Sequence, residues 1–102
     1  MKQKSNLFSK IYEVVKKIPQ GKVSTYGDIS NYLLIKNPKI VGWALHANKS
    51  KEVPCHRVVN KEGKLAKSYS FGGEREQKQK LLEEGVEFNK DTVDLKKSKV
   101  CL

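Results

Sequence analysis

Residues 25–48 read TYGDISNYLLIKNPKIVGWALHAN, a pattern that predicts two short helices joined by a tight turn. Thr25 places a hydroxyl at a helix start and Asp28 places a carboxylate three residues later, which is a variant of the capping box. Asn37-Pro38 ends the first helix and begins the second, because proline suits a first helical turn. Apolar residues recur at helical spacing at Ile29, Tyr32, Leu33 and Ile35, and then at Ile40, Val41, Ala44 and Leu45.

Asn48 ends the second of these helices, so the pair forms a candidate helix-turn-helix. Any two short helices with a short link fit that description, and the signal is weak by itself. It gains weight from the charge around it. Residues 1–50 carry nine lysines and two acidic residues, and the whole chain has a formal net charge of +10. A lopsided positive field suits a polyanion, and the alternative is a lysine-rich solvated surface.

The flanking residues predict further short elements. Ser5 can cap a preceding helix that Pro19 stops, with an apolar face of Phe8, Ile11, Val15 and Ile18. Downstream we expect a strand at 57–59, a hairpin turn at 60–63, a helix at 74–84 capped by Gly85, and short strands at 86–88 and 93–95. The fold class is therefore mainly α with short β-strands, in a single domain over residues 1–102 with a flexible tail from about 96 to 102.

Composition narrows the compartment and the chemistry. No stretch approaches the roughly 20 apolar residues of a membrane span, and the basic start of the chain has no apolar segment behind it. We therefore expect a cytoplasmic protein, associated with the nucleoid, or a nuclear one in a eukaryote. Cys55 and Cys101 could form one disulfide, but intracellular chains rarely keep disulfides. Together with His46 and His56 they lack the spacing of a zinc site, so no metal is predicted.

Pro54-Cys55-His56-Arg57-Val58 sets a possible nucleophile beside a possible base. A thiol at its ordinary pKa of about 8.5 is only a few per cent thiolate at neutral pH. A nearby imidazole and the positive charge of Arg57 would raise that fraction. The alternative is that Cys55 is a small buried apolar residue and His56 a satisfied core or surface histidine.

Five motifs in this order resemble the C-terminal domain of O6-alkylguanine-DNA alkyltransferases (methylated-DNA–protein-cysteine methyltransferases). They are IPQGKVSTYGDI at 18–29, Val41-Gly42 through Ala47-Asn48, PCHRVV at 54–59, YSFG at 69–72 and LLEEG at 81–85, within a matched region of about 7–88. The resemblance implies a winged helix-turn-helix domain that enters the minor groove of double-stranded DNA and flips out an O6-alkylguanine. The alkyl group would pass irreversibly to the cysteine of a monomer that reacts once, without a cofactor.

The resemblance also implies roles for individual residues. Cys55 would be the nucleophile, His56 the base acting through a water, Glu84 the carboxylate that orients His56, and Asn48 the residue that holds the turn before the active-site segment. Contacts to the lesion or to DNA would come from Tyr26, Lys39, Gly42, Leu45, Arg57, Val58 and Ser70. Among them, Tyr26 and Ser70 would be hydrogen-bond donors to the base, and Leu45 and Val58 would line its pocket. Taken singly, Glu84 could instead be an exposed carboxylate near a helix end, and Tyr26 and Leu45 could be core residues.

Some features depart from the alkyltransferases. The chain is short, as in alkyltransferase-like proteins, which bind O6-alkylguanine and flag it for nucleotide excision repair without repairing it. Those proteins usually have Trp or Ala where this chain has Cys55, yet residues 81–95 resemble them more than the enzymes. Lys39 stands where the family has a finger arginine, and it lacks the planar fork of Arg. The run 49–53 is polar and one residue short, and a carboxylate at Glu52 would oppose thiolate formation.

The sequence therefore predicts a single-turnover alkyltransferase. A non-catalytic alkyltransferase-like protein, with nucleotide excision repair proteins as partners, is the alternative. A generic winged-helix regulator is a third reading, but it would leave Cys55, His56 and Glu84 unexplained.

Overall fold

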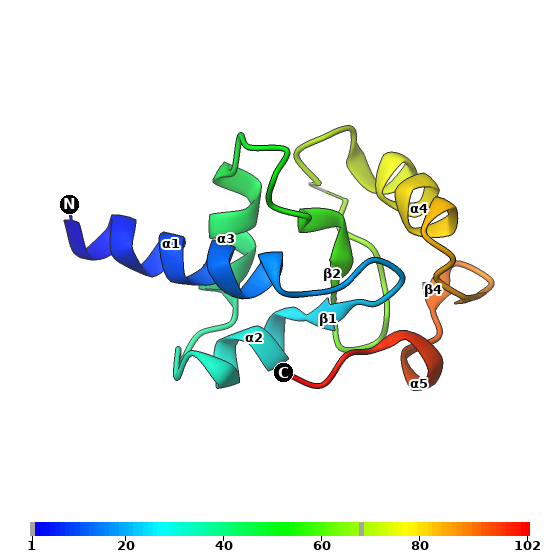
Figure 1. The fold of residues 1–102 in the computed structure, drawn as a ribbon, viewed down its shortest axis with the longest axis horizontal. Helices are drawn as coiled ribbons and strands as arrows, with labels where there is room; N and C mark the ends of the chain where they lie inside the picture. Colours follow the sequence, from blue (N-terminus) through cyan, green and yellow to red (C-terminus); the bar gives the residue numbers. More distant parts are fainter. Residues whose placement is uncertain (1, 68) are drawn as a thin grey trace.

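The computed structural model describes residues 2–67 and 69–102, with side chains described from Leu7 onward. A helical half, a central pair of short strands (the ribbon) and a C-terminal half lie side by side across the molecule (Figure 1). The elements are α1 (Lys2–Lys16), β1 (Ser24–Thr25), α2 (Tyr26–Tyr32), α3 (Lys39–Ala47), the 3₁₀ turn η1 (Cys55–Arg57), β2 (Val58–Val59), α4 (Gly73–Glu83), β3 (Phe88–Asn89), β4 (Thr92–Val93) and α5 (Leu95–Ser98).

The helical half is built from α1, α2 and α3. The apolar face of α1 packs against the other two helices through Ile11 and Val15, and Ile18 follows just after the helix; all three are essentially buried. Tyr12 adds a hydrogen bond, because its hydroxyl donates to the carbonyl of Ala44 in α3 at 2.7 Å. The prediction that α1 begins after Ser5 was wrong, since the helix already includes Lys2. Residues 2–4 are good helix formers and contain no breaker.

Only the Thr25 part of the predicted capping box of α2 forms. The Asp28 amide donates to Thr25 Oγ1 at 3.1 Å, as a helix N-cap requires. The Asp28 carboxylate instead pairs with Lys99 Nζ at 2.8 Å. Tyr32 was expected in the core but is 52% exposed, because α2 ends there. Leu34 follows in the turn to α3, with a φ of 59° and 90% of its surface exposed.

The central ribbon joins the two halves. β1 and β2 pair in parallel, with Ser24 opposite Val58 and Thr25 opposite Val59. Because neighbouring strand residues face opposite sides, Val58 packs into the core of the helical half and Val59 into the core of the C-terminal half. The predicted hairpin after β2 was wrong. The turn does form, with the Gly63 amide donating to the Asn60 carbonyl at 2.9 Å, but the partner of β2 lies upstream.

A buried glutamine attaches α4 to this ribbon. Gln77 has no exposed surface, and its Nε2 donates to the carbonyls of His56 and Val58 at 3.1 and 3.0 Å. Its Oε1 accepts from the Ala66 amide at 2.7 Å. Gln77 thus satisfies three buried backbone groups around the cysteine motif, and α4 is held at a fixed position beside it.

The C-terminal residues are more firmly held than the sequence predicted. Asp94 caps α5, and the chain beyond it runs beside Val23, which donates to the Ser98 carbonyl and accepts from the Val100 amide at 2.9 and 2.8 Å. The expectation of a flexible tail from residue 96 is therefore corrected for residues 96–100. Ser98 is buried as well. Over residues 2–67 and 69–102, none of the helices has both the length and the apolar character needed to cross a bilayer.

Candidate active site

Cys55 lies at the start of η1 with 5% of its surface exposed. Its thiol points to the Leu45 carbonyl of α3 at 3.8 Å, and Asn48 Nδ2 donates to Sγ at 3.4 Å. The same Asn48 amide group donates to the Ser50 carbonyl at 2.7 Å and accepts from the Ser50 amide at 3.1 Å. Asn48 therefore fixes both the turn after α3 and the position of the sulfur.

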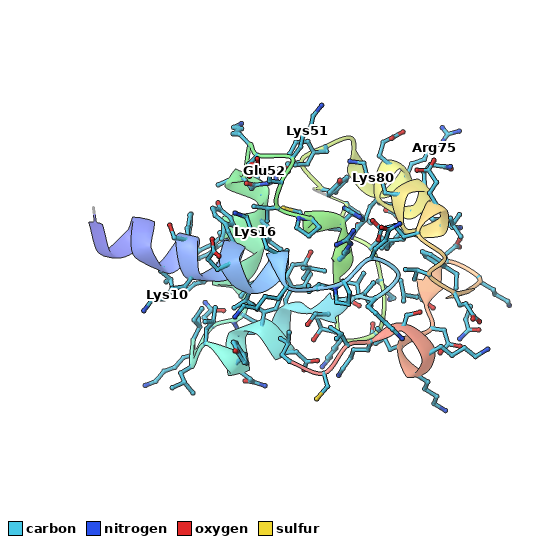
Figure 2. All side chains as sticks on the ribbon, viewed as in Figure 1. Lys10, Lys16, Lys51, Glu52, Arg75 and Lys80 are labelled. Carbon is cyan, nitrogen blue, oxygen red and sulfur yellow. The ribbon has the colours of Figure 1, made fainter. Side chains whose placement is uncertain are left out.

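The surroundings of Cys55 hold opposing influences on its charge. Burial raises the pKa of the Cys55 thiol above its ordinary value, while the hydrogen bond from Asn48, a backbone hydrogen bond and the positive charge of Lys80 lower it. Glu52, which the sequence suggested as an opposing charge, is an exposed residue beside Lys51 at the outer edge of the loop after α3 (Figure 2). Burial has the larger effect, so the thiol is protonated at neutral pH in the free protein.

The carboxylate of Glu84 is shared by His56 and Arg57, the two residues that follow Cys55 in the chain. His56 Nε2 is 2.7 Å from Glu84 Oε2. Arg57 forms a two-point contact with the same carboxylate, with Nε 3.0 Å from Oε1 and the second guanidinium nitrogen 2.8 Å from Oε2. Both of these side chains and Glu84 are mostly buried, with 13–16% of their surface exposed. Glu84 holds this position because it caps the end of α4, where Gly85 turns the chain with a φ of 87°.

The protonation states of the pair follow from these contacts. Burial acts to raise the pKa of Glu84, but hydrogen bonds from Arg57 and His56 outweigh it and lower the pKa below its ordinary value. Burial lowers the pKa of His56 despite the neighbouring carboxylate. Glu84 is therefore an ionised acceptor and His56 a neutral ring at pH 7. Because a carboxylate only accepts, His56 carries its proton on Nε2, and Nδ1 is the basic nitrogen.

The structure gives Arg57 a different place from the predicted DNA contact. Its remaining guanidinium nitrogen donates to the Ile18 carbonyl at 2.8 Å, so the whole group is used inside the protein. Val58 also differs from its predicted place in the pocket wall, because it is fully buried in β2 opposite Ser24. Both corrections have one cause: the chain turns inward after Cys55 to join the ribbon.

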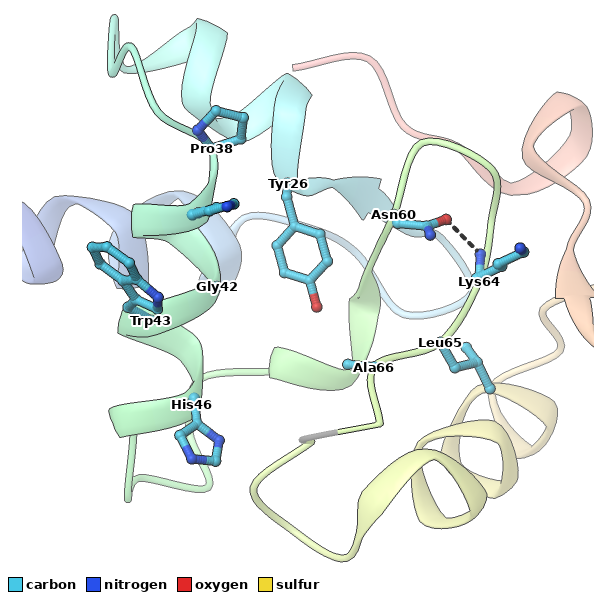
Figure 3. Close-up of a pocket in the computed structure, with 10 residues that line it drawn as sticks. Tyr26, Pro38, Gly42, Trp43, His46, Asn60, Lys64, Leu65 and Ala66 are labelled. Atoms are coloured by element: carbon cyan, nitrogen blue, oxygen red, sulfur yellow. Dashed lines mark hydrogen bonds between the residues drawn. The ribbon is translucent and has the colours of Figure 1, made fainter.

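Two adjoining hollows lie in front of the cysteine. A small one of about 20 Å³, large enough for about one water, is lined by Tyr26, Gly42, Leu45, His46, Cys55, Ala66, Tyr69 and Ser70. A larger groove of about 560 Å³ runs between α3 and residues 60–66, and the Tyr26 hydroxyl points into it (Figure 3). Lys39, Trp43 and Lys64 lie along this groove. A nucleobase-sized group that approaches Cys55 through the groove must therefore displace the wall of the small hollow.

Three residues of this region escaped the sequence analysis. Trp43 is 60% exposed on α3, and an exposed tryptophan on the second helix of a helix-turn-helix was a signal that could have been used. Lys80 and Tyr69 meet at 2.8 Å beside the small hollow. The position of Lys80 four residues before Glu84, on the same helix face, was the available signal for that contact.

Fold and site together define a winged helix-turn-helix protein with a buried thiol beside its second helix. Comparison with known families identifies it further: the model of the 6-O-methylguanine DNA methyltransferase, DNA binding domain, matches residues 6–86, and the chain belongs to this family. The resemblance found from the five sequence motifs is confirmed, and so is the predicted fold class.

Similar proteins fall on both sides of the choice that the sequence left open. Alkyltransferase-like protein 1 of Schizosaccharomyces pombe is 44% identical over 82 residues, which cover 78% of this chain and 76% of that protein. The crystal structure of S. pombe Atl1 with damaged DNA containing O6-carboxymethylguanine superposes with a TM-score of 0.81 at 35% identity, covering 96% of this chain and 97% of that one. A methylated-DNA–protein-cysteine methyltransferase of Thermococcus barophilus is 45% identical over 80 residues, covering 76% of this chain but 43% of that protein.

Proposed function

We propose that this protein flips an O6-alkylguanine out of double-stranded DNA and transfers the alkyl group to Cys55. The observation that carries the proposal is the position of Cys55 at the wall of a hollow that adjoins the groove along α3, with the next residue, His56, bonded to Glu84. A buried structural cysteine would need neither a basic histidine nitrogen nor an oriented carboxylate beside it.

The proposed reaction moves one proton and one alkyl group. The Cys55 thiol gives its proton through a water to His56 Nδ1, and the ionised Glu84 stabilises the imidazolium that forms. The thiolate attacks the alkyl carbon, so that a sulfur–carbon bond forms as the bond from carbon to O6 breaks. The electron pair stays on the guanine, which takes up one proton. Thiol and alkylguanine thus become thioether and guanine without a cofactor.

Tyr26 and Ser70 are suited to hold the flipped base in this reaction. Both border the small hollow with Cys55. Burial, and then the negative charge of a Cys55 thiolate, raise the pKa of Tyr26, so its hydroxyl remains a hydrogen-bond donor at neutral pH. Leu45 adds an apolar wall, and Gly42 leaves room beside the Tyr26 ring, from which a Cβ would be 4.0 Å away.

The groove along α3 supplies a surface for the DNA strand. Lys39 is exposed at the first position of α3, and its amide is held by Asn37 Oδ1 at 3.0 Å. Lys64 lies on the opposite wall, on the segment that follows β2. The Lys64 ammonium also pairs with Glu62 at 3.4 Å. Basic side chains along a groove suit a strand whose phosphates lie outside and whose bases turn inward.

The second candidate function is recognition of the lesion without transfer, leading to nucleotide excision repair. Two observations favour it. Burial raises the pKa of Cys55, which lowers the thiolate fraction in the free protein. The chain also covers nearly the whole of the Atl1 structure but less than half of the T. barophilus methyltransferase. In this function Cys55 would be one wall of a binding pocket.

Intact mass measured after incubation with O6-methylguanine duplex separates the two functions. The proposed transfer adds about 14 Da, one CH₂, to the protein. The Cys55→Ala variant should remain unmodified, and the matched Cys101→Ala variant should gain the same mass as the wild type. Unmodified wild-type protein that still prefers lesion duplex over undamaged duplex would establish the second function instead.

A further inference from the structure

Lys80 forms an unusual set of contacts behind the cysteine pocket. Its ammonium donates to the Tyr69 hydroxyl at 2.8 Å and lies 5.3 Å from the centre of the Tyr69 ring and 5.4 Å from that of Phe71. The two rings are 5.9 Å apart and tilted by 59°. The ammonium lies beyond the hydroxyl end of the Tyr69 ring, so a charge-assisted hydrogen bond holds it to Tyr69 and a cation–π contact holds it to Phe71.

Tyr69 belongs to the wall of the pocket, and Phe71 supports it from the core. Tyr69 lines the small hollow together with Cys55 and Ser70, and only 8% of its surface is exposed. Phe71 follows two residues later and packs on the same core. The hollow has room for about one water, so a larger group can enter it only if its wall moves.

Lys80 reaches the wall from the inner face of α4. In Figure 2 it lies on the side of the helix that faces the rest of the chain, whereas Arg75 lies on the outer side. Gln77 and Glu84, at three residues before and four residues after it, share that face. The first holds the backbone of His56 and the second holds its ring. Lys80 is thus fixed relative to the base and the thiol.

We propose that Lys80 is a positioning residue of the alkyl-transfer pocket. Its ammonium latches Tyr69 and Phe71 over the space in front of Cys55 and supplies that space with positive charge. A guanine that enters must loosen the latch, and the cation then remains beside the sulfur that has to ionise. The role of Lys80 in repair rests on the proposed function. The contact of Lys80 with Tyr69 and Phe71 can be tested without DNA.

Lys80 of α4 brings a positive charge near the thiol, and it differs in type from the other titratable groups there. Tyrosines and histidines reach or adjoin Cys55 from the remaining elements: Tyr12 of α1, Tyr26 of α2, His46 of α3, His56 of η1 and Tyr69 of the wall. Arg57 is held by Glu84. Lys80 acts in the sense of lowering the pKa of both Cys55 and His56. It therefore favours the thiolate and the neutral base at once.

Iodoacetamide provides a test that needs no DNA. The thiolate displaces iodide and forms a thioether, so the rate rises with pH to a limiting value, and the midpoint of that rise reports the ionisation of Cys55. The experiment uses the Cys101→Ser background, in which Cys55 is the single remaining cysteine. Lys80→Met should move the midpoint upward by about half a pH unit or more. It should also raise the limiting rate several-fold, because the wall opens more readily.

Two variants control this experiment. Lys80→Arg keeps the cation and should keep the midpoint near that of the background protein. Lys78→Met removes a matched lysine two residues away, which lies 5.6 Å from the Phe88 ring and pairs with Asp91 at 3.2 Å, and should leave both parameters unchanged. Thermal unfolding of each variant establishes that it is folded. A Lys80→Met profile that keeps either the midpoint or the limiting rate of Lys78→Met overturns the proposal.

A second arm links the latch to the lesion. Lys80→Met should lose several-fold of the preference for O6-methylguanine duplex over undamaged duplex, while Lys78→Met keeps it. A wild-type protein without any such preference would refute the proposed function and leave the iodoacetamide result standing. Preserved lesion preference in Lys80→Met would refute a role of the latch in recognition.

Discussion

At the scale of single residues, Glu84 organises the site by binding two side chains, besides the Gly21 amide at 3.5 Å. It accepts from the His56 ring and from the guanidinium of Arg57, and all three side chains are largely buried. The hydrogen bonds from Arg57 help keep Glu84 ionised, and burial keeps the His56 ring neutral. Arg57 thus acts on His56 through the Glu84 carboxylate.

This arrangement predicts acid sensitivity in two stages. Folded His56 has a pKa below its ordinary value of 6.5, so the unfolded chain takes up that proton first, and the free energy of unfolding should fall as pH drops below about 6.5. Glu84, with a pKa below 4.5, should cause a further loss at more acidic pH. Urea unfolding from pH 7 down to about pH 3 measures both, because the Glu84 loss begins below about pH 4.5. His56→Gln should remove the first stage, and an unchanged pH dependence in that variant would contradict this account.

Trp43 predicts an optical signal for DNA binding. It is the single tryptophan of the chain, 60% exposed, and lines the groove with Lys39. A duplex bound along α3 should quench its fluorescence, and Trp43→Ala should weaken binding by about 1–3 kcal/mol if the indole stacks on a base. The control protein combines Trp43→Phe with Leu82→Trp, so that its single tryptophan lies on the outer face of α4. Equal quenching in that protein would place the DNA elsewhere.

At the scale of elements, the turn between α2 and α3 carries local strain. Leu34 has a φ of 59°, a left-handed conformation that disfavours L side chains with bulk, and its side chain is 90% exposed, so burial does not compensate. The neighbouring Leu33 and Ile35 are packed against the core. The turn keeps this geometry because both neighbours are fixed.

Leu34→Asn should therefore stabilise the protein by about 0.5–1 kcal/mol, since asparagine adopts the left-handed region more readily. The measurement is the free energy of unfolding in urea. Leu82→Asn provides the matched control, because Leu82 is also exposed but helical, and asparagine should cost stability there. A destabilised Leu34→Asn protein would show that the leucine makes a contribution its exposure does not reveal.

Elements with local signals were predictable from the sequence, and long-range pairings were not. The cap at Thr25, the end of α3 at Asn48 and the end of α4 before Gly85 all depend on residues within one or two turns. The parallel pairing of β1 with β2 joins distant two-residue strands, which are too short to show a periodicity. The inward course of Arg57 depends on that pairing, so the motif alone could not show it.

At the scale of the whole molecule, the site lies where two cores meet. The helical half and the C-terminal half each have a buried apolar cluster, and the two residues of β2 belong one to each. Cys55 is in the first cluster, whereas Leu81 of α4 is in the second. The small hollow itself is lined mainly by residues of the first cluster, while α4 brings Lys80 and Glu84 to the site from the side of the second.

The charge of the molecule predicts how DNA binding depends on salt. With a net charge of +10, affinity for duplex should fall linearly with the logarithm of salt concentration. Lesion and undamaged duplexes should give parallel lines, because the pocket proposed to distinguish them is largely buried. Lys64→Ala should reduce the slope by about 1, and Lys90→Ala, in the β3–β4 hairpin, should not. Electrophoretic titrations at several salt concentrations measure the slopes, and converging lines would contradict the prediction.

The inner face of α4 restricts how this family member can change. Gln77, Lys80 and Glu84 each reach a different part of the site from one stripe of the helix. Loss or gain of a single residue within α4 would rotate every position beyond it by about 100°. Such a change would separate these contacts together while leaving α2 and α3 untouched. Viable insertions in this helix should therefore come in whole turns, and a one-residue deletion would convert a repair protein into a plain DNA binder in a single genetic event.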